Sequence, residues 1–417
     1  MVVYLDQDNI QATIKQKELP FVGISNEWEN EGVAHIRATP SRHSFGKESK
    51  VLFTGDEISD NFEGDYFFIV HIKDINNFVT EVYHKTKDQR LEKIKFLIIP
   101  TKAELYSRNK GILEVSVLEK KSATIVGLGS FGSQIAIALA KAGVGEFNLI
   151  DFDRVELHNL ARHTSNLNEL GRLKTDAIED AVKGKNPYAI VNKYPIDIND
   201  DLDLLRQIIR DSDMVICATD NNKSRFNLSR ILVEEKKIGI FGRAVTRAEG
   251  GDVFIYRPGK ACYCCLIGSG FFNSADEEIT NLQSARESGR IASYVPLEEA
   301  NAMVQVGLAA DIEPICNLMV KLALVELSKG SDSGIKCLEN ELVHDYYMWA
   351  NRRERRHAQW SAFPNSANRP TILRWYGAYV PKEDLCPVCS KSIVLDEGEE
   401  YEELLNNDIS LDDVSLD

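Results

Sequence analysis

The chain has 417 residues, of which 43% are hydrophobic, and a net charge of −15 at pH 7. This length predicts two or three domains, because single cores stop growing beyond about 250–300 residues. No apolar run reaches the ~18 residues of a membrane helix, and the N-terminus lacks the pattern of a signal peptide. We therefore expect a cytoplasmic protein that does not enter a membrane. The acidic balance also argues against nucleic acid as the partner.

Residues 1–105 are predicted to form a mixed region that recognises a partner or substrate. Two runs rich in aromatic and β-branched residues, 66–72 and 94–100, are typical of strands. We find no motif there that carries chemistry.

Residues 106–330 alternate strand-like and helix-like segments. The strands expected here include SATIVGLG, EFNLIDF, DMVICAT and KIGIFGRAV. Such alternation predicts an α/β fold of the Rossmann type, with a mostly parallel sheet and helices on both faces. Residues 331–395 are predicted to form a C-terminal subdomain.

The last segment, 396–417, is an acidic tail. Residues 395–417 hold ten acidic side chains and no basic one, and the rest of the chain has a net charge of only −5. This composition predicts a disordered, solvated segment. A docking or autoinhibitory segment remains the alternative.

Three glycines follow the first strand of the α/β region. Gly127, Gly129 and Gly132 form a G-x-G-x-x-G pattern between a strand and a helix. Such glycines permit a tight turn and a close approach of the backbone to a phosphate chain at a helix N-terminus. The pattern alone does not distinguish a dinucleotide from ATP.

Charged and amide side chains follow the next strands. Asp151 and Asp153 end the second strand, and a carboxylate there can bind ribose hydroxyls. Asn159, Arg162 and Lys174 then bring an amide and two cations, which suit a triphosphate that loses pyrophosphate. Asp220 follows a later strand at the ligand-binding edge of the sheet, where a carboxylate can bind Mg²⁺. The sequence therefore predicts a MgATP site.

In this order, the motifs resemble the ThiF/MoeB family of adenylyltransferases, which includes ubiquitin-activating enzymes. The resemblance covers about residues 106–330 and rests on GLGSFG, DFDRVELHNLARH, GRLKTDAIEDAVKGKNP and ATDNN, with His163 where the family pattern has Gln. It implies a ThiF-type adenylation domain in which Asp151 binds the ribose. It also implies that Asn159, Arg162 and Lys174 bind phosphates and that Asp220 binds Mg²⁺. Arg108, in LYSRNKG, would reach the triphosphate across a homodimer interface.

Two Cys-x-x-Cys pairs predict a structural zinc site. Cys262 and Cys265 form the first pair, and Cys386 and Cys389, 121 residues further on, form the second. Four thiolates make a closed tetrahedral site for Zn²⁺ with no position left for water. The zinc would tie the C-terminal subdomain to the adenylation domain. Cys264 competes as a ligand, and a redox pair is the alternative.

The chain departs from full ubiquitin-activating enzymes in its remaining cysteines. The segment 266–310, where such enzymes generally carry the cysteine that accepts the acyl group, contains no cysteine. Cys217 and Cys316 lie in apolar segments and are expected to be core thiols. Cys337 follows a glycine-rich turn and is the best remaining candidate for a thioester.

Together these features predict an adenylyltransferase that uses ATP and Mg²⁺. The family resemblance implies that its substrate is the C-terminal carboxylate of a ubiquitin-like or sulfur-carrier protein that ends in glycine, as in bacterial ubiquitin-like conjugation systems associated with phage defence. The acyl group would pass to a conjugating enzyme or another protein thiol. Three alternatives remain open: a peptide adenylyltransferase of the microcin C type, an enzyme that adenylates tRNA, and a zinc-tied dimeric scaffold without activity.

Overall fold

The computed structural model describes residues 1–30, 33–39, 47–58, 66–86, 88, 90–99, 105–269, 286, 294–296, 307–332, 334–352 and 372–390. The chain divides into two compact units, Met1–Lys110 and Gly111–Asp417. No helix in these described stretches is both long and apolar enough to cross a bilayer. The tail 396–417 and most of the segment 266–310 lie outside the described residues.

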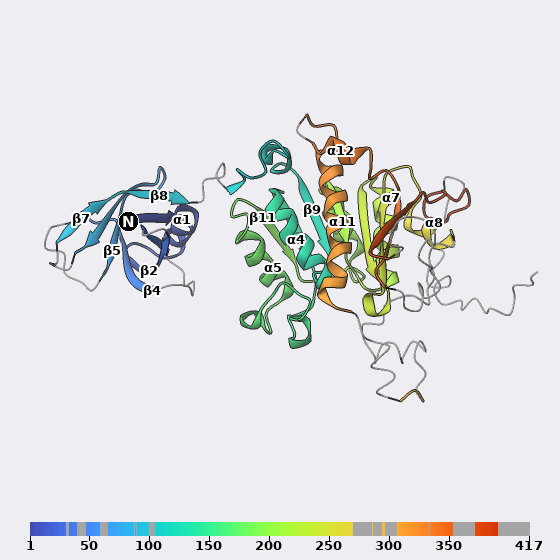
Figure 1. Cartoon of the computed structure of the whole chain (residues 1–417), viewed down its shortest axis with the longest axis horizontal. Coiled ribbons are helices and arrows are strands. Elements are labelled where there is room, and N and C mark those ends of the chain that lie inside the picture. Colours follow the sequence, from blue (N-terminus) through green and yellow to red (C-terminus); the bar gives the residue numbers. More distant parts are fainter. Residues whose placement is uncertain are drawn as a thin grey trace, which may run out of the picture. The chain divides into compact units, whose positions relative to one another are not determined.

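The first unit is built on a curved sheet with the order β7-β6-β5-β4-β2-β3-β1-β8. Its two edge strands, β7 and β8, are consecutive in the chain and only Lys95 separates them. The sheet must therefore curve until its two edges lie near one another (Figure 1). Phe53, Phe68 and Val82 from the strands pack with Ile10 of helix α1 in one apolar core.

The elements of the first unit are β1 (Val2–Asp6), α1 (Gln7–Gln16), β2 (Phe21–Asn30), β3 (Val33–Thr39), β4 (Lys47–Thr54), β5 (Phe68–Asp74), β6 (Val79–Lys85), β7 (Leu91–Ile94) and β8 (Phe96–Ile99).

The second unit is built on a sheet with the order β11-β10-β9-β12-β13-β14-β15-β16. The first five strands in this order are parallel, and the last three are joined antiparallel. Helical crossovers connect the parallel strands. This arrangement is expected where short buried strands alternate with amphipathic helices along the chain. The predicted α/β fold with a mostly parallel sheet is confirmed.

Each face of this sheet buries a separate core. Helices α4, α5 and α11 cover one face, and Ile125 and Phe147 of the sheet belong to their core. Helices α6, α7 and α8 cover the other face with residues such as Val126 and Val215. Neighbouring residues Ile125 and Val126 therefore point to opposite faces, as the two-residue period of a strand demands. In Figure 1 the long helix α11 lies beside α4 on the same face of the sheet.

The strands of the second unit are β9 (Ser122–Val126), β10 (Glu146–Ile150), β11 (Ile190–Tyr194), β12 (Met214–Cys217), β13 (Ile238–Ala244), β14 (Gly250–Tyr256), β15 (Tyr346–Ala350) and β16 (Arg374–Ala378). Its α-helices are α3 (Val115–Leu118), α4 (Ser130–Ala142), α5 (Lys174–Lys183), α6 (Leu202–Arg210), α7 (Asn222–Glu234), α8 (Tyr263–Gly268), α11 (Ala309–Ser328) and α12 (Lys336–Glu339). Short 3₁₀ turns are η1 (Leu157–Asn159), η2 (Leu167–Glu169) and η3 (Thr246–Ala248).

Candidate nucleotide site at the carboxyl edge of the sheet

The glycine turn connects β9 to α4 and is shaped by close backbone packing. Gly127 has φ +84°, and a Cβ there would lie 2.7 Å from the carbonyl oxygen of Ala218. Gly132 lies in the first turn of α4, where a Cβ would lie 1.8 Å from the carbonyl oxygen of Gly127. Around Gly129, by contrast, a Cβ would meet no atom within 4 Å. The first and third glycines are required for packing, whereas the second leaves open space at the N-terminus of a helix, where phosphate binds well.

Asp151, at the end of β10, supports this turn. One carboxylate oxygen accepts a hydrogen bond from Leu128 N at 2.6 Å, and the other accepts one from Asp153 N at 2.8 Å. Burial raises the pKa of Asp151, while the charge of Lys174 and the two backbone donors oppose that shift. Asp151 therefore holds the glycine turn in addition to its predicted role at the ribose.

Lys174 begins α5 and points back to the same two acids. Its side chain is buried, and Nζ lies 2.7 Å from Asp153 Oδ2 and 3.9 Å from Asp151 Oδ1. A bare ammonium group would be costly at this depth, and the two carboxylates compensate for its burial. A bound phosphate would offer Lys174 a third anionic partner.

The loop between β10 and α5 carries Asn159 and Arg162. The side-chain oxygen of Asn159 accepts a hydrogen bond from Glu156 N at 2.9 Å, and its carbonyl oxygen accepts one from Arg162 N at 2.9 Å. The loop is thus held by its own hydrogen bonds, while the Arg162 side chain is half-buried.

Asp220 follows β12 and precedes α7. Its side chain is exposed. Asn221 caps the helix by accepting a hydrogen bond from Ser224 N at 2.9 Å. Arg225, one turn further on, is buried and donates from Nη2 to the carbonyl oxygen of Thr219 at 2.7 Å. These contacts anchor the backbone on both sides of Asp220.

One cavity of about 660 Å³ brings most of the predicted site residues together. They come from the glycine turn, the end of β10, the arginine loop, α5 and the end of β12. The predicted residues that line it are Gly127, Gly129, Asp151, Asp153, Asn159, Arg162, Lys174 and Asp220. Gly132 acts on the cavity through the turn that it packs against. Polar groups that converge in a concave site at the carboxyl edge of an α/β sheet are typical of a ligand site.

Two arginines in this cavity wall were missed by the sequence reasoning. Arg225 lies four residues after the cap Asn221, so both occupy the same face of α7. Arg243, next to the last residue of strand β13 at the carboxyl edge, is buried and pairs with Asp252 at 2.8 Å. Burial opposes the charge of Arg243, but Asp252 outweighs it and raises the pKa of the guanidinium. Two features of the sequence could have indicated these residues. Arg225 follows Asp220 closely, and Arg243 lies at the end of a predicted strand.

Arg108 was predicted to reach a triphosphate from another protomer. Its side chain is exposed, and the residue belongs to the first unit, Met1–Lys110. Its role stays a prediction.

The four cysteines of the two Cys-x-x-Cys pairs meet at one point. The sulfur atoms of Cys262, Cys265, Cys386 and Cys389 all lie within 4.8 Å of one another. Three of the Sγ–Sγ separations are 3.8, 3.5 and 3.4 Å. A tetrahedral zinc ion with Zn–S bonds of about 2.3 Å sets its ligands about 3.8 Å apart, so this group fits Zn²⁺.

The protonation chemistry of these thiols also fits a metal. The hydrogen bond to Cys265 and burial raise the pKa of Cys262, and burial raises the pKa of Cys389 to about 12. The hydrogen bond with Cys262 lowers the pKa of Cys265 to about 4, which favours its thiolate. Cys262 and Cys389 would stay protonated unless a cation replaces their protons. Cys264 is not among the four residues that gather, although it was a competing candidate.

Of the remaining cysteines, Cys217 and Cys316 are buried, and burial raises the pKa of Cys316 to about 12. The raised pKa makes the Cys316 thiol a poor nucleophile. Cys337, by contrast, is exposed.

Comparisons with known proteins agree with this geometry. The profile of the ThiF family matches residues 106–359. The molybdopterin-synthase adenylyltransferase of Escherichia coli K12 is 36% identical over 151 residues, which cover 36% of this chain and 59% of that protein. The ubiquitin-like modifier-activating enzyme 5 of Caenorhabditis elegans is 27% identical over 194 residues, which cover 43% of this chain and 46% of that protein. The chain thus spans about half the length of the curated relatives it matches.

The solved structures extend the likeness of fold over more of the chain. Escherichia coli MccB with MccA-N7isoASN superposes with a TM-score of 0.50 at 18% identity, over 69% of this chain and 75% of MccB. At this identity the likeness concerns the fold alone. Since the ThiF profile covers more than half of the sequence, and the residues of its motifs line one cavity, the chain belongs to the ThiF family.

Proposed function

We propose that this protein is a MgATP-dependent adenylyltransferase that activates the C-terminal carboxylate of a ubiquitin-like or sulfur-carrier protein. The carboxylate would attack the α-phosphorus of ATP and form an acyl-adenylate. The bond from the α-phosphorus to the bridging oxygen would break, and pyrophosphate would leave. Relatives named adenylyltransferases support the reaction class.

The cavity of about 660 Å³ carries the proposal. It combines a glycine turn, acids at the end of β10, the cations Arg162 and Lys174, and the separate acid Asp220. A nicotinamide cofactor keeps its phosphates and would not need this set. A triphosphate that loses pyrophosphate builds up negative charge, which positive groups in fixed positions stabilise.

We assign the following roles to the residues. Asp151 and Asp153 bind the ribose side of the nucleotide. Arg162 and Lys174, with Asn159, bind the phosphates, and Arg225 and Arg243 add positive potential at the end of the cavity near Asp220. A magnesium ion held by Asp220 would screen the phosphate oxygens and stabilise the leaving pyrophosphate. The protein contributes chiefly by positioning, since no covalent step on a side chain is required.

The activated acyl group is proposed to pass to a thiol of another protein, such as a conjugating enzyme. Cys217 and Cys316 are buried, which argues against an acceptor role. Cys337 is exposed and remains the internal alternative. We also propose a cytoplasmic homodimer in which Arg108 serves the partner copy, with residues 1–105 binding the substrate and Zn²⁺ on the four cysteines holding residues 331–395 in place.

A peptide substrate is the second candidate. The fold likeness to MccB covers a larger share of this chain than the curated relatives do. One of those structures is described as the microcin C7 biosynthetic enzyme MccB in complex with N-formylated MccA. A peptide adenylyltransferase of this kind would release a stable nucleotide–peptide product, whereas an acyl-adenylate is labile.

ATP–pyrophosphate exchange tests the proposal. Purified protein would be assayed with ubiquitin-like and sulfur-carrier proteins ending in glycine, with short peptides and with tRNA. We expect exchange only with one carboxyl-terminal protein partner, and a fall of at least about 100-fold in Asp220→Asn, because the metal site loses its charge. Asp200→Asn, at an exposed position outside the cavity, is the matched control and should exchange as the wild type does.

Each other outcome has a defined meaning. Exchange with a peptide, together with a stable phosphoramidate-type product in mass spectrometry, would favour the second candidate. Transfer to tRNA would replace the protein substrate by a nucleic acid. MgATP binding without exchange for any acceptor, and an unaltered cellular function in Asp220→Asn, would favour a scaffold.

A further inference from the structure

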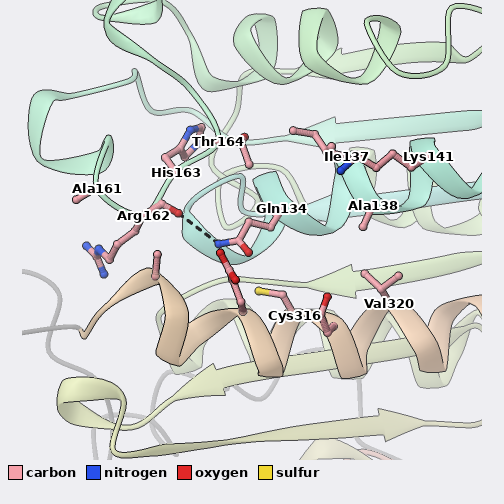
Figure 2. Close-up of a pocket in the computed structure, with 13 residues that line it drawn as sticks. Gln134, Ile137, Ala138, Lys141, Ala161, Arg162, His163, Thr164, Cys316 and Val320 are labelled. Atoms are coloured by element: carbon pink, nitrogen blue, oxygen red, sulfur yellow. Dashed lines mark hydrogen bonds between the residues drawn. The ribbon is translucent and has the colours of Figure 1, made fainter.

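His163 lies behind the phosphate-binding face of the arginine loop. Its side chain is only 9% exposed. It lines a second cavity, of about 350 Å³, that α4, α11 and the loop enclose and that shares Arg162 with the nucleotide cavity. Figure 2 shows His163 and Arg162 beside Gln134 of α4. The imidazole is therefore next to a proposed phosphate ligand, although it does not line the nucleotide cavity itself.

Both ring nitrogens of His163 have backbone partners. Nε2 lies 2.6 Å from the carbonyl oxygen of Leu128, and Nδ1 lies 3.0 Å from the amide nitrogen of Ser165. A carbonyl oxygen only accepts and an amide N–H only donates, so Nε2 must carry the proton and Nδ1 must accept. These partners select the neutral Nε2–H tautomer, since a proton on Nδ1 would face the Ser165 N–H.

The two partners belong to the two halves of the proposed phosphate site. Leu128 lies in the glycine turn, and its N–H donates to Asp151 at 2.6 Å. The backbone of Leu128 is thus held by Asp151 at its N–H and by His163 at its carbonyl oxygen. On the loop side, Gln134 Nε2 donates to the carbonyl oxygen of Arg162 at 3.4 Å, drawn as the dashed line in Figure 2.

We propose that His163 is a positioning residue that, as a neutral imidazole, locks the glycine turn to the Arg162 loop, and that its protonation unlocks the phosphate site. This inference rests on the proposed binding of ATP, but it assigns a role to a residue that touches no substrate. In acid, a second proton on the ring would turn the acceptor of the Ser165 N–H into a donor. The hydrogen bond would be lost, and Arg162 would lose its fixed place.

The surrounding charges disfavour the imidazolium form. Burial lowers the pKa of His163, the charge of Lys174 on α5 adds to this shift, and only the hydrogen bond to Leu128 opposes it. Around the cavity stand the cations Lys141 and Arg162, the acid Glu313 and the buried thiol of Cys316, with Asp151 beyond the Leu128 peptide.

The sign of the pH effect follows. The folded protein keeps His163 neutral further into acid than the unfolded chain does, so the lock is complete above the usual histidine pKa of about 6.5. The stability that the neutral imidazole contributes to the folded protein is lost as the pH falls from about 6.5 through the lowered pKa of His163.

Glutamine provides the decisive variant because its amide has the same donor and acceptor without titrating. In His163→Gln, Nε2–H can donate to Leu128 and Oε1 can accept from Ser165. We expect His163→Gln to bind ATP as tightly as the wild type at pH 7.5 and to keep that affinity below the pH at which the wild-type ring becomes protonated, which the nitrogen-15 titration of the ring measures. The wild type should weaken roughly tenfold once His163 is protonated, because a buried hydrogen bond is lost. His163→Leu should be weak at both ends of this pH range.

The control is His84→Gln in the first unit. His84 also has a pKa lowered by burial, but it belongs to another core. This variant should retain the acid sensitivity of the wild type. Equal acid sensitivity in His163→Gln and the wild type would overturn the proposal.

A second measurement does not need ATP. Nitrogen-15 spectra of the histidine rings should show His163 with its proton on Nε2 at pH 7.5. After correction for the slower intrinsic exchange in acid, the protection of the Ser165 amide against hydrogen exchange should fall in the wild type as His163 is protonated, and not in His163→Gln. A proton on Nδ1 at pH 7.5 would refute the lock. If no form of the protein binds ATP, the proposed function fails, while these ring and amide signals still decide whether the lock exists.

Discussion

The nucleotide cavity and the four-cysteine cluster of the second unit reach their geometry by different routes. Most residues that line the cavity come from one continuous stretch, Gly127–Lys174. They lie at the ends of strands and helices that follow one another in the chain. The cysteine cluster joins two pairs that are 121 residues apart in sequence. The first leaves an open space for a ligand, whereas the second closes around a single point. An open polar site serves chemistry, and a closed thiol site serves stability.

The two regions share one structural element. Tyr263, between Cys262 and Cys265 in the chain, stacks on Phe241 of β13 with ring centroids 4.9 Å apart. Its amide donates to Ser229 of α7, the helix that follows Asp220. The cysteine cluster therefore braces the same strand and helix that form one wall of the nucleotide cavity.

The largest expected effect is on the cysteine cluster. In Cys386→Ser, zinc would lose one of four ligands, and the melting temperature should fall by roughly 10 °C, because loss of a structural metal is among the most destabilising changes. Metal analysis and calorimetry measure both quantities. Cys337→Ser, at an exposed thiol outside the cluster, is the control and should change neither. Unchanged zinc content in Cys386→Ser would contradict the four-cysteine site.

Arg162→Ala should act on the reaction and spare the fold. Removing one positive group from a developing phosphate charge costs about 100- to 1000-fold in rate. The fall should be seen in pyrophosphate exchange with the melting temperature nearly unchanged, since the Arg162 side chain is only half-buried. The matched control is Arg172→Ala, whose side chain pairs with Glu169 and Asp180 at the surface. Equal losses in the two variants would remove Arg162 from the phosphate site.

The two glycines of the turn should separate stability from binding. Gly127→Ala forces a side chain into a positive φ and against Ala218, so we expect a loss of about 1–3 kcal/mol of unfolding free energy. Gly129→Ala has room for its methyl group in the folded chain, but that group occupies the space proposed for phosphate. Its stability should be unchanged while ATP affinity falls. Denaturant titration and isothermal calorimetry measure the two effects, and the reverse pattern would mean that phosphate binds elsewhere.

The sequence was most informative where function and local structure use the same residues. The glycine turn, the acids after the second strand, the Asn and Arg of the following loop and the Lys that begins α5 could all be predicted, because each follows from its place next to a strand or helix end. Arg225 and Arg243 were missed. Each has an isolated position in the sequence, and only the meeting of α7 with the end of β13 gives them a common cavity.

By itself, the sequence determined the α/β architecture of the second unit and which residues stand at the carboxyl edge of its sheet, since hydrophobic period and turn residues act over short distances. Tertiary structure alone decided that β7 and β8 end on opposite edges of the first sheet, and that the glycine turn and the arginine loop meet through the imidazole of His163. It also decided that Cys264, which competed as a ligand, is not among the four cysteines that converge. These features depend on contacts between segments that are distant in sequence, and a local pattern carries no information about such contacts.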